Sequence, residues 1–449
     1  MRPPAFNLRN LLSLVGLLLA GAVLANSFVE PPARRTSVVE KLATLKPNFG
    51  PANYTDALNA ADAQLGLARE RVARSPGDWL NQESFARASM ARFRLTGSYA
   101  DLAAAQAALD RAEKSTSDET GPMLTDAIFA ASSHKLPRLE ERLNDLNGVV
   151  VPLQPDRAES LALQGDLDFY SGRYEAALRS YQASAALSDG AGIAFRLGRY
   201  HQRTGKSDTA LQYFASAAHT STQKSPMFLS SVWLQVGTVE LERGNWEKAE
   251  RHFETANKIF PGYWLNQAHI AQMRAVRGDI AGAISAYEKI AHQSGSPETM
   301  DALAALHRRQ GNAVQSRYWS GKSATIWSER LSLLPEAAYG HAFDHQMLFG
   351  SPKVALDLAR RNFAARPYGD SAVLLASAYL ANGNAKQARL TLEPLTKTRW
   401  QGAPQHAALA ATYAMLGQEE ASARQQEMAL AINPKIFDPS APLIWFGHH

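Results

Sequence analysis

Apolar residues recur at the spacing of an α-helix along most of this chain, in short segments that come in pairs. The clearest pair is predicted over residues 233–261, WLQVGTVELERGNWEKAERHFETANKIFP. Trp233 and Gly237 lie on one face of its first helix, and Ala249 and Phe253 lie on one face of its second helix. This spacing predicts two short helices that pack against each other.

The residues at the turn and at the end of this pair suit those places. Gly244 lies in the turn between the helices, and Pro261 cannot continue the second helix. Gly237 is small where two antiparallel helices must come close, whereas Phe253 is large enough to fill the gap between pairs. The segment therefore predicts a complete helix-turn-helix unit.

The same unit recurs along the chain with a glycine in most of the predicted turns. An early copy has Gly97, and a degenerate copy over residues 122–146 has two helical patterns but no turn glycine. The later turn glycines are separated by 33, 39, 34, 33, 39, 33 and 34 residues. They are Gly172, Gly205, Gly244, Gly278, Gly311, Gly350, Gly383 and Gly417. An ordinary globular fold does not produce such regular spacing.

The clearest copy follows the pattern W-x2-[LV]-G, then A-x3-F and then Pro, which resembles the tetratricopeptide repeat. That family repeats every 34 residues and stacks its helix pairs into a solenoid. Glu240 departs from the pattern, because the family usually has Tyr there. The resemblance implies an all-α, right-handed superhelical solenoid of about ten helix pairs over residues 85–434.

The segments around and within the repeats are expected to have simpler roles. Residues 26–53 are rich in Pro, Arg and Ser and predict a tether, and residues 54–84 predict an N-terminal helical cap. The two 39-residue intervals indicate insertions, a polar loop at 219–227 and extra helical turns at 320–336. The apolar tail, 435–449, is expected to fold back and cap the last pair, or else to dock a partner or the membrane surface.

Residues 1–25 resemble a bacterial secretory signal peptide. Arg2 and Arg9 precede an apolar run, and the segment ends in V-L-A at Ala25. Cleavage near Ala25 would release the protein, whereas residues 11–29 could instead anchor it in the inner membrane. Both alternatives predict that the repeats lie in the periplasm.

Composition and motifs exclude several classes of function. The 449 residues include no Cys, so disulfides, a thiol nucleophile and Cys-ligated metals are excluded. The formal charge of +5 would fall to +3 on removal of Arg2 and Arg9 with the leader, which is too small to indicate nucleic-acid binding. Gly321, Lys322 and Ser323 end like a phosphate-binding loop, but Ser316 stands where that motif needs glycine.

His341 and His345 are four residues apart and could share a metal on one helix face, although such a pair is far more often two surface histidines. No complete catalytic motif is present in the sequence. We therefore expect no catalytic residue, no cofactor and no metal, and a protein that is not an enzyme.

What remains is a binding surface, which the resemblance places on the first helix of each pair. Arg196, Arg199 and Arg203 are spaced so that they fall on one stripe of such a helix, and arginines beside aromatic rings are common in binding sites. The alternative is a solvated basic face paired with nearby acids. The predicted partner-binding residues are Asp166, Phe169, Tyr170, Phe195, Arg196, Arg199, Gln202, Arg203, Gln235, Thr238 and Glu242.

The sequence thus predicts a non-catalytic protein-binding scaffold of the bacterial envelope, with one or more envelope proteins as partners in an assembly or secretion process. A polysaccharide-binding module of an envelope glycan synthesis or export system is the alternative. Exposed aromatic rings on the concave face would favour a sugar, whereas alternating charge and apolar pockets would favour a peptide.

Overall fold

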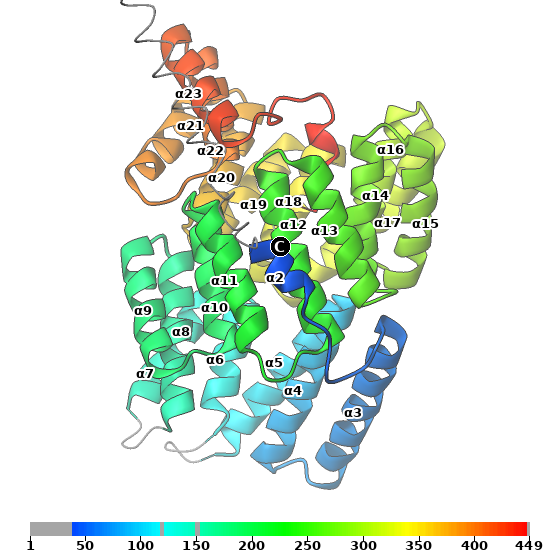
Figure 1. Cartoon of the computed structure of the whole chain (residues 1–449), viewed down its shortest axis with the longest axis vertical. Coiled ribbons are helices and arrows are strands. Elements are labelled where there is room, and N and C mark those ends of the chain that lie inside the picture. The colour runs from blue at the N-terminus through cyan, green and yellow to red at the C-terminus, as the bar shows by residue number, and fades with distance from the viewer. Residues whose placement is uncertain (1–37, 117–120, 149–152, 447–449) are drawn as a thin grey trace, which may run out of the picture. The chain divides into compact units, whose positions relative to one another are not determined.

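The computed structural model describes residues 38–116, 121–148 and 153–446 (Figure 1). Throughout these ranges the regular structure is helical, with α-helices α2 to α23 and two short 3-10 helices. The predicted signal peptide or membrane anchor lies outside them. Among the helices that are described, none is both long and apolar enough to cross a membrane.

Ten consecutive helix pairs make up most of the chain, which confirms the predicted solenoid. Within each pair the two helices pack against each other, and each second helix packs on the first helix of the next pair. The pairs are α4 (Trp79–Thr96) with α5 (Tyr99–Lys114), α6 (Met123–Ser132) with α7 (Leu136–Asn147), α8 (Gln154–Tyr170) with α9 (Tyr174–Leu187), α10 (Ala191–Arg203) with α11 (Ser207–Thr220), α12 (Pro226–Glu242) with α13 (Trp246–Ile259), α14 (Trp264–Val276) with α15 (Ile280–Ser294), α16 (Pro297–Arg309) with α17 (Ala313–Leu333), α18 (Pro335–Phe349) with α19 (Pro352–Ala365), α20 (Gly369–Ala381) with α21 (Ala385–Leu392), and α22 (Ala403–Met415) with α23 (Glu419–Ile432).

Close packing within the pairs follows the predicted exchange of small and large residues. A Cβ atom added to Gly237 would lie 2.4 Å from the ring of Phe253, which is fully buried. The same arrangement occurs in two earlier pairs, where a Cβ would lie 2.4 Å from the facing ring at Gly165 and 2.7 Å from it at Gly198. Glycine is therefore needed at these positions for space rather than for backbone conformation.

The turns within pairs show why glycine recurs. Seven of the eight regularly spaced turn glycines have φ between +70° and +92°, a conformation that L side chains rarely adopt. Gly350 differs, with φ of −111°, and after it Pro352 begins the next helix and holds Ser351 in an extended conformation. In the degenerate copy His134 takes the left-handed place, with φ of +59°.

The chain divides into two units, Met1–Thr44 and Leu45–His449, and the second contains all the repeats. The first contains the short helix α2 (Val38–Ala43), which lies within the predicted tether. A glutamate in the first turn and a lysine in the last turn suit its helix dipole.

In the second unit, the chain before the helix α3 (Tyr54–Arg74) is tied to the solenoid. The Asn48 amide donates to the Lys224 carbonyl at 3.0 Å, and the Asn48 side chain donates to the Thr222 carbonyl at 3.1 Å. These acceptors belong to the first insertion, which is a loop, as predicted. The second insertion is helical, because α17 continues unbroken to Leu333.

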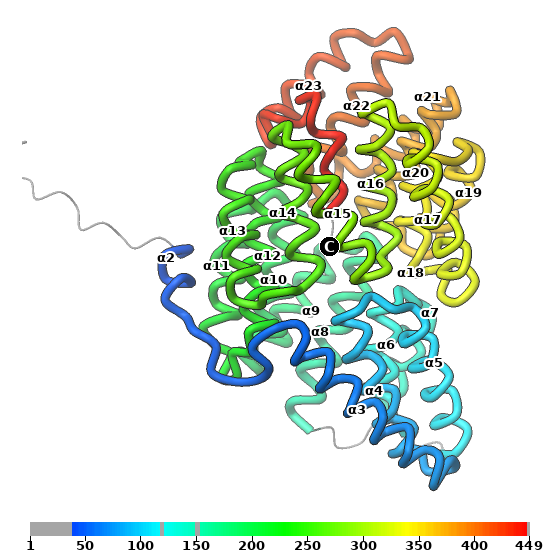
Figure 2. The backbone as a smooth tube through the Cα atoms, turned by 90° about the vertical axis from the view of Figure 1, so that its right-hand side faces the viewer, coloured from blue at the N-terminus to red at the C-terminus, as the bar shows by residue number. Residues whose placement is uncertain are grey.

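The later pairs close onto the earlier ones along a line of contacts that we name the seam. Three early turns take part, at Gly172, Gly205 and Gly244, and each packs against a later loop or helix end. Their respective neighbours are Pro367, Gln401 and Asn433. Figure 2 shows the later helices lying alongside the earlier ones rather than continuing away from them.

Hydrogen bonds and ring contacts hold the seam together. The Gly369 amide donates to the Tyr174 hydroxyl at 2.9 Å across 195 residues, and the Gln401 amide donates to the Arg203 carbonyl at 3.1 Å. The Lys435 ammonium lies 4.4 Å from the centre of the Trp246 ring. These contacts therefore tie the late helix pairs to the early ones.

The C-terminal tail does not lie on the last helix pair, where it was predicted to lie. After a 3-10 turn (Ala441–Leu443), the amides of Trp445 and Phe446 both donate to the Gln272 side chain at 2.7 Å, and both rings contact Tyr287. The tail therefore covers an apolar surface of α14 and α15, not that of the last pair. Its anchor is a side-chain amide facing that surface, which a sequence pattern does not indicate.

Candidate functional site

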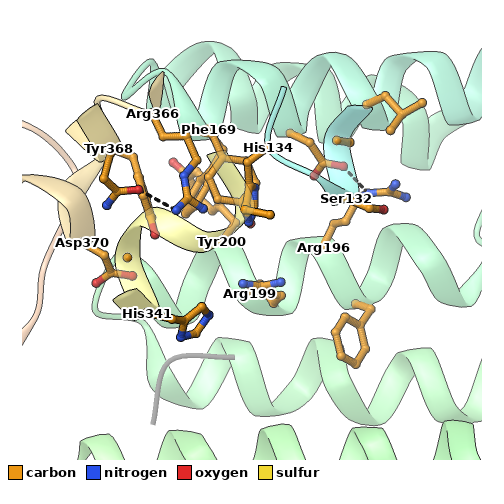
Figure 3. Close-up of a pocket in the computed structure, with 18 of the residues that line it drawn as sticks. Ser132, His134, Phe169, Arg196, Arg199, Tyr200, His341, Arg366, Tyr368 and Asp370 are labelled. Carbon is orange, nitrogen blue, oxygen red and sulfur yellow. Dashed lines mark hydrogen bonds and ion pairs between the residues drawn. The ribbon is translucent and has the colours of Figure 1, made fainter. Parts of the chain in front are cut away.

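A partly open cavity of about 770 Å³ lies between the early and late helix pairs (Figure 3). Its walls come from α8, α10 and the turn between α6 and α7 on one side, and from α18 to α20 on the other. The seam holds the two walls together. A site of this size matches the usual volume of a ligand pocket.

Helix α10 supplies one wall, because residues three and four apart share a helix face. Phe195 lines the cavity and packs edge-on against the Phe214 ring at 5.2 Å. Arg196 lies beside it and is fully used inside the protein, since its guanidinium bonds Asp166 at 2.9 Å and Glu159 at 2.8 Å. Burial opposes the charge on Arg196, but these two carboxylates outweigh it and raise the arginine pKa.

Arg199, one turn further along α10, is a different kind of arginine. Its half-buried side chain enters the cavity between α10 and α18, and no described carboxylate lies within ion-pair distance of it. The same helix therefore carries an arginine committed to the fold and an arginine available to a ligand.

Arg366, just after α19, enters from the opposite wall. Its side chain is 6% exposed and donates one hydrogen bond, at 2.7 Å, to the side-chain oxygen of Asn362. The Nε–H has no partner among the described residues. Burying a guanidinium without a carboxylate is costly, and here the Tyr368 ring, whose centre lies 5.5 Å from the Arg366 guanidinium, offsets part of that cost through a cation–π contact.

His134 lies on the floor of the cavity, at the turn where the other pairs have glycine. Its ring packs edge-on against Tyr170 at 5.1 Å, and its Nδ1 has no described partner. Burial first, and then the charges of Arg366, Arg199 and His341, hold the His134 pKa well below its usual range. His134 is therefore neutral at neutral pH.

One carboxyl group of the cavity is also perturbed. Asp344 exposes surface to the cavity but is enclosed by protein, and burial followed by repulsion from Asp301 raises its pKa to about 7. Asp344 therefore carries only part of a charge near neutral pH. Since Asp166 is paired with Arg196, the charge of the cavity is set by Arg199 and Arg366 on one side of the balance and by Asp344 and Asp370 on the other.

The aromatic residues around the cavity pack mainly against one another. Phe169 is 7% exposed and stands at the centre of this cluster. Its ring centroid lies 5.5–6.3 Å from those of Tyr170, Tyr174, Tyr200, Tyr368 and Trp400. Rings held in this way strengthen the seam and offer few open faces for stacking.

The structure brings some of the predicted site residues together and separates others. Those that line the cavity are Asp166, Phe169, Tyr170, Phe195, Arg196 and Arg199. Gln202 and Arg203 instead bond Glu242 at 2.9 Å and line a second hollow of about 730 Å³ beside the seam. Gln235 and Thr238 are buried within α12.

Sequence reasoning missed His134, Arg366 and Tyr368. The absent turn glycine in residues 122–146 was the one available signal for His134. Arg366 and Tyr368 come after the second helix of a pair, whereas the sequence prediction took binding residues only from first helices.

Groups that resemble a catalytic or metal site do not have the necessary geometry. Ser323 and Asp301 both contact Nδ1 of His345, at 3.3 and 2.8 Å, so this histidine cannot relay a proton between them. The His341 ring stacks on Trp327, whereas Nδ1 of His345 is bonded to Asp301. In the described ranges no three His, Asp or Glu side chains are grouped as metal ligands.

No known family profile and no curated protein matches the sequence. Solved structures with a similar arrangement include a tetratricopeptide repeat protein from Parabacteroides merdae, at 12% identity and a TM-score of 0.34, over 56% of this chain and 98% of that one. A Rap protein complexed with competence and sporulation factor has 13% identity and a TM-score of 0.45, and the match covers 73% of this chain and 97% of that one. Cut9 with Hcn1, from an APC/C complex, has 14% identity and a TM-score of 0.38, and the match covers 88% of this chain and 84% of that one. At these values the neighbours carry no argument about function.

Proposed function

We propose that this chain, which is a solenoid of tetratricopeptide-like repeats, acts as a non-catalytic scaffold that holds a segment of a protein partner in its cavity. The observation that carries the proposal is the composition of the cavity wall, where Arg199 and Arg366 alternate with apolar and aromatic surface. A peptide offers both charges and apolar side chains to such a wall. Capture would be reversible, with no bond made or broken.

The wall composition favours a peptide over the polysaccharide alternative. Sugar recognition by stacking needs exposed ring faces, whereas the rings around Phe169 pack on one another. An oligosaccharide remains the competing ligand in the experiments below.

The proposal includes a location in the bacterial envelope. Residues 1–25 support export, with cleavage near Ala25 or retention of residues 11–29 as an inner-membrane anchor. The partners would then be envelope proteins engaged in assembly or secretion. Mass spectrometry of the N-terminus from fractionated cells tests this part, and a full-length protein in the cytoplasm would contradict it.

Site-specific photocrosslinking in native cells tests the capture itself. We would replace Phe195, which lines the cavity, by p-benzoylphenylalanine, and compare it with the same replacement of Tyr318, which is 49% exposed on α17. The expected result is one dominant protein adduct at position 195 that is absent at position 318.

A second variant makes the crosslinking specific. Adding Arg199→Glu should reduce the adduct at position 195 at least fivefold, because the reversed charge repels the bound segment without breaking a described ion pair. Combining Arg196→Glu and Arg203→Glu is not informative, since both arginines hold internal ion pairs. An adduct of equal intensity at both positions, or no protein adduct at all, would contradict the proposed function.

A further inference from the structure

We infer that the end of the C-terminal tail, residues 443–446, is a displaceable occupant of the solenoid's own groove. A partner segment with two adjacent aromatic side chains would bind to the same surface of α14 and α15 once the tail has left it. We name this surface, formed by His269, Gln272 and Tyr287, the tail seat. The partner segment rests on the proposed function, whereas the occupation of the seat by the tail does not.

The tail seat recognises main-chain groups through one side chain. The amides of Trp445 and Phe446 both donate to the side-chain oxygen of Gln272, at 2.7 Å each. Gln272 comes from the middle of a helix and is fully buried, so this acceptor is held in a fixed place. Every peptide segment carries such amides at non-proline residues, and another segment could therefore make the same two hydrogen bonds.

Two adjacent aromatic rings supply the side-chain part of the contact. The Phe446 ring is fully buried and stacks on Tyr287, with the two ring centres 6.2 Å apart. The Trp445 ring meets Tyr287 edge-on at 6.0 Å, remains partly exposed and also lines the cavity. Buried rings contribute most of the attraction in such a contact. The seat therefore favours a segment with aromatic residues at two consecutive positions.

The tail seat lies on the same stripe of the groove that faces the cavity two pairs earlier. Gln272 precedes the turn glycine of its pair, Gly278, by six residues, as Arg199 precedes Gly205. Equivalent positions in stacked repeats face the same side of a solenoid. Arg199 lines the cavity, and so does Trp445 of the tail. The tail and a segment captured in the cavity therefore occupy neighbouring parts of one groove.

The tail reaches its seat as an arm that is folded mainly on itself. Five of its amides each donate to the carbonyl three residues earlier, within residues 433–444. They belong to Ile436, Asp438, Ala441, Leu443 and Ile444. Three prolines in residues 434–442 lack the amide that pairing with a neighbouring element would use. The arm can therefore leave the seat without unfolding a helix pair, as a local opening.

Binding of the tail's own sequence from solution tests the inference. The probe is a fluorescein-labelled peptide of residues 435–446, KIFDPSAPLIWF, with an amidated C-terminus. Fluorescence anisotropy measures its affinity for the full-length chain. In the wild type the attached tail competes at a high effective concentration, so the peptide should bind weakly. Phe446→Asp in the chain places a charge where the buried ring was, and the peptide should bind this variant at least tenfold more tightly.

Matched changes assign that gain to the tail seat. Phe437→Asp makes the same replacement at an exposed position of the tail and should leave the peptide affinity at its wild-type value. Adding Gln272→Leu to Phe446→Asp removes the shared acceptor at similar side-chain volume, so the affinity should fall at least tenfold. A peptide with Trp445→Ala and Phe446→Ala should likewise bind at least tenfold more weakly.

Hydrogen exchange of the unaltered chain gives a test that no substitution can disturb. If the tail leaves its seat while the solenoid stays folded, the amides of Trp445 and Phe446 exchange through local opening. Their protection factors should be at least a hundredfold smaller than those at the centre of α14. Equal protection would mean that the tail leaves only when the helix pair unfolds, which would overturn the inference.

The outcomes separate this inference from the proposed function. Equal peptide affinity for the wild type and Phe446→Asp, or no binding to either, would overturn the inference and leave capture in the cavity standing. In the crosslinking experiment, Phe446→Asp should increase the protein adduct at position 195 at least threefold. An adduct of unchanged yield would overturn the competition between tail and partner. No adduct in either chain, with the peptide still bound by Phe446→Asp, would overturn the proposed function and leave the tail as an occupant of the groove.

Discussion

Turn glycines of two kinds follow one another along this chain. At the seam, a Cβ added to Gly172, Gly205 or Gly244 would lie 2.6, 2.9 or 2.5 Å from an atom of the later pairs. At the open turns the added atom would meet nothing within 4 Å, and these turns are at Gly278, Gly311, Gly383 and Gly417. All seven have similar positive φ. The open turns therefore require glycine for conformation alone, whereas the seam turns require it for conformation and for space.

The largest expected effect comes from removing the ring on which the seam closes. Trp400 is 3% exposed, contacts Tyr174, and lies so close to Gly369 that an added Cβ would be 2.0 Å away. We expect Trp400→Ala to reduce the free energy of unfolding by about 4 kcal/mol, as for other buried tryptophans. Urea unfolding followed by circular dichroism should also change from one transition to two, because the late pairs would no longer be coupled to the early ones.

Gly172→Ala is expected to have the next largest effect. The new methyl group adds a contact with the Pro367 carbonyl to the strain of a left-handed alanine, and together these should cost about 3 kcal/mol. The same urea titration measures it. If Gly172→Ala lost no more free energy of unfolding than the same change at an open turn, the contact with Pro367 would contribute nothing to the effect.

Gly383→Ala is the matched change at an open turn. Its φ of +73° is almost the same as the +75° of Gly172, but no atom opposes the new methyl group. The expected loss is about 1 kcal/mol, from backbone strain alone. Gly383→Asn should lose less free energy of unfolding than Gly383→Ala, because asparagine tolerates this conformation. If Gly383→Ala and Gly172→Ala lost the same amount, the distinction between the two kinds of turn would be contradicted.

The smallest effect is expected from a charge pair on the surface of the seam. Arg399 and Glu175 lie 3.0 Å apart, with 49% and 57% of their side chains exposed. Arg399→Ala should change the free energy of unfolding by about 0.5 kcal/mol, and raising the salt concentration should remove even this difference. A larger loss would mean that electrostatics, rather than ring packing, holds the seam.

Sequence could predict the pairs because each depends on residues close together in the chain. Gly237 and Phe253 are within one unit, and their pattern repeats often enough to be recognised. The seam joins residues such as Tyr174 and Gly369, which are 195 apart and follow no shared pattern. Nothing local distinguishes Gly172 from Gly383, so the contacts between the early and late pairs could not be predicted.

The candidate site was predictable to the same extent. The stripe on α10 identified Arg199, because helical spacing alone decides which side chains share a face. It could not show that Arg196 would bond Asp166 or that Arg366 would approach from a distant pair. His134 was visible only as a missing glycine, whose meaning depends on the cavity beside it.

The constant register of the seam has a consequence for how this chain can evolve. Open solenoids gain and lose repeats by duplication or deletion, because each pair contacts only its neighbours. Here the turn at Gly172 meets Pro367 and the turn at Gly205 meets Gln401, so the number of pairs between the partners is fixed. One pair inserted between them would move every later loop past its partner, and one pair removed would leave it short. The seam thus constrains the number of repeats, and we expect relatives that share it to differ in loop lengths but not in the number of pairs that it spans.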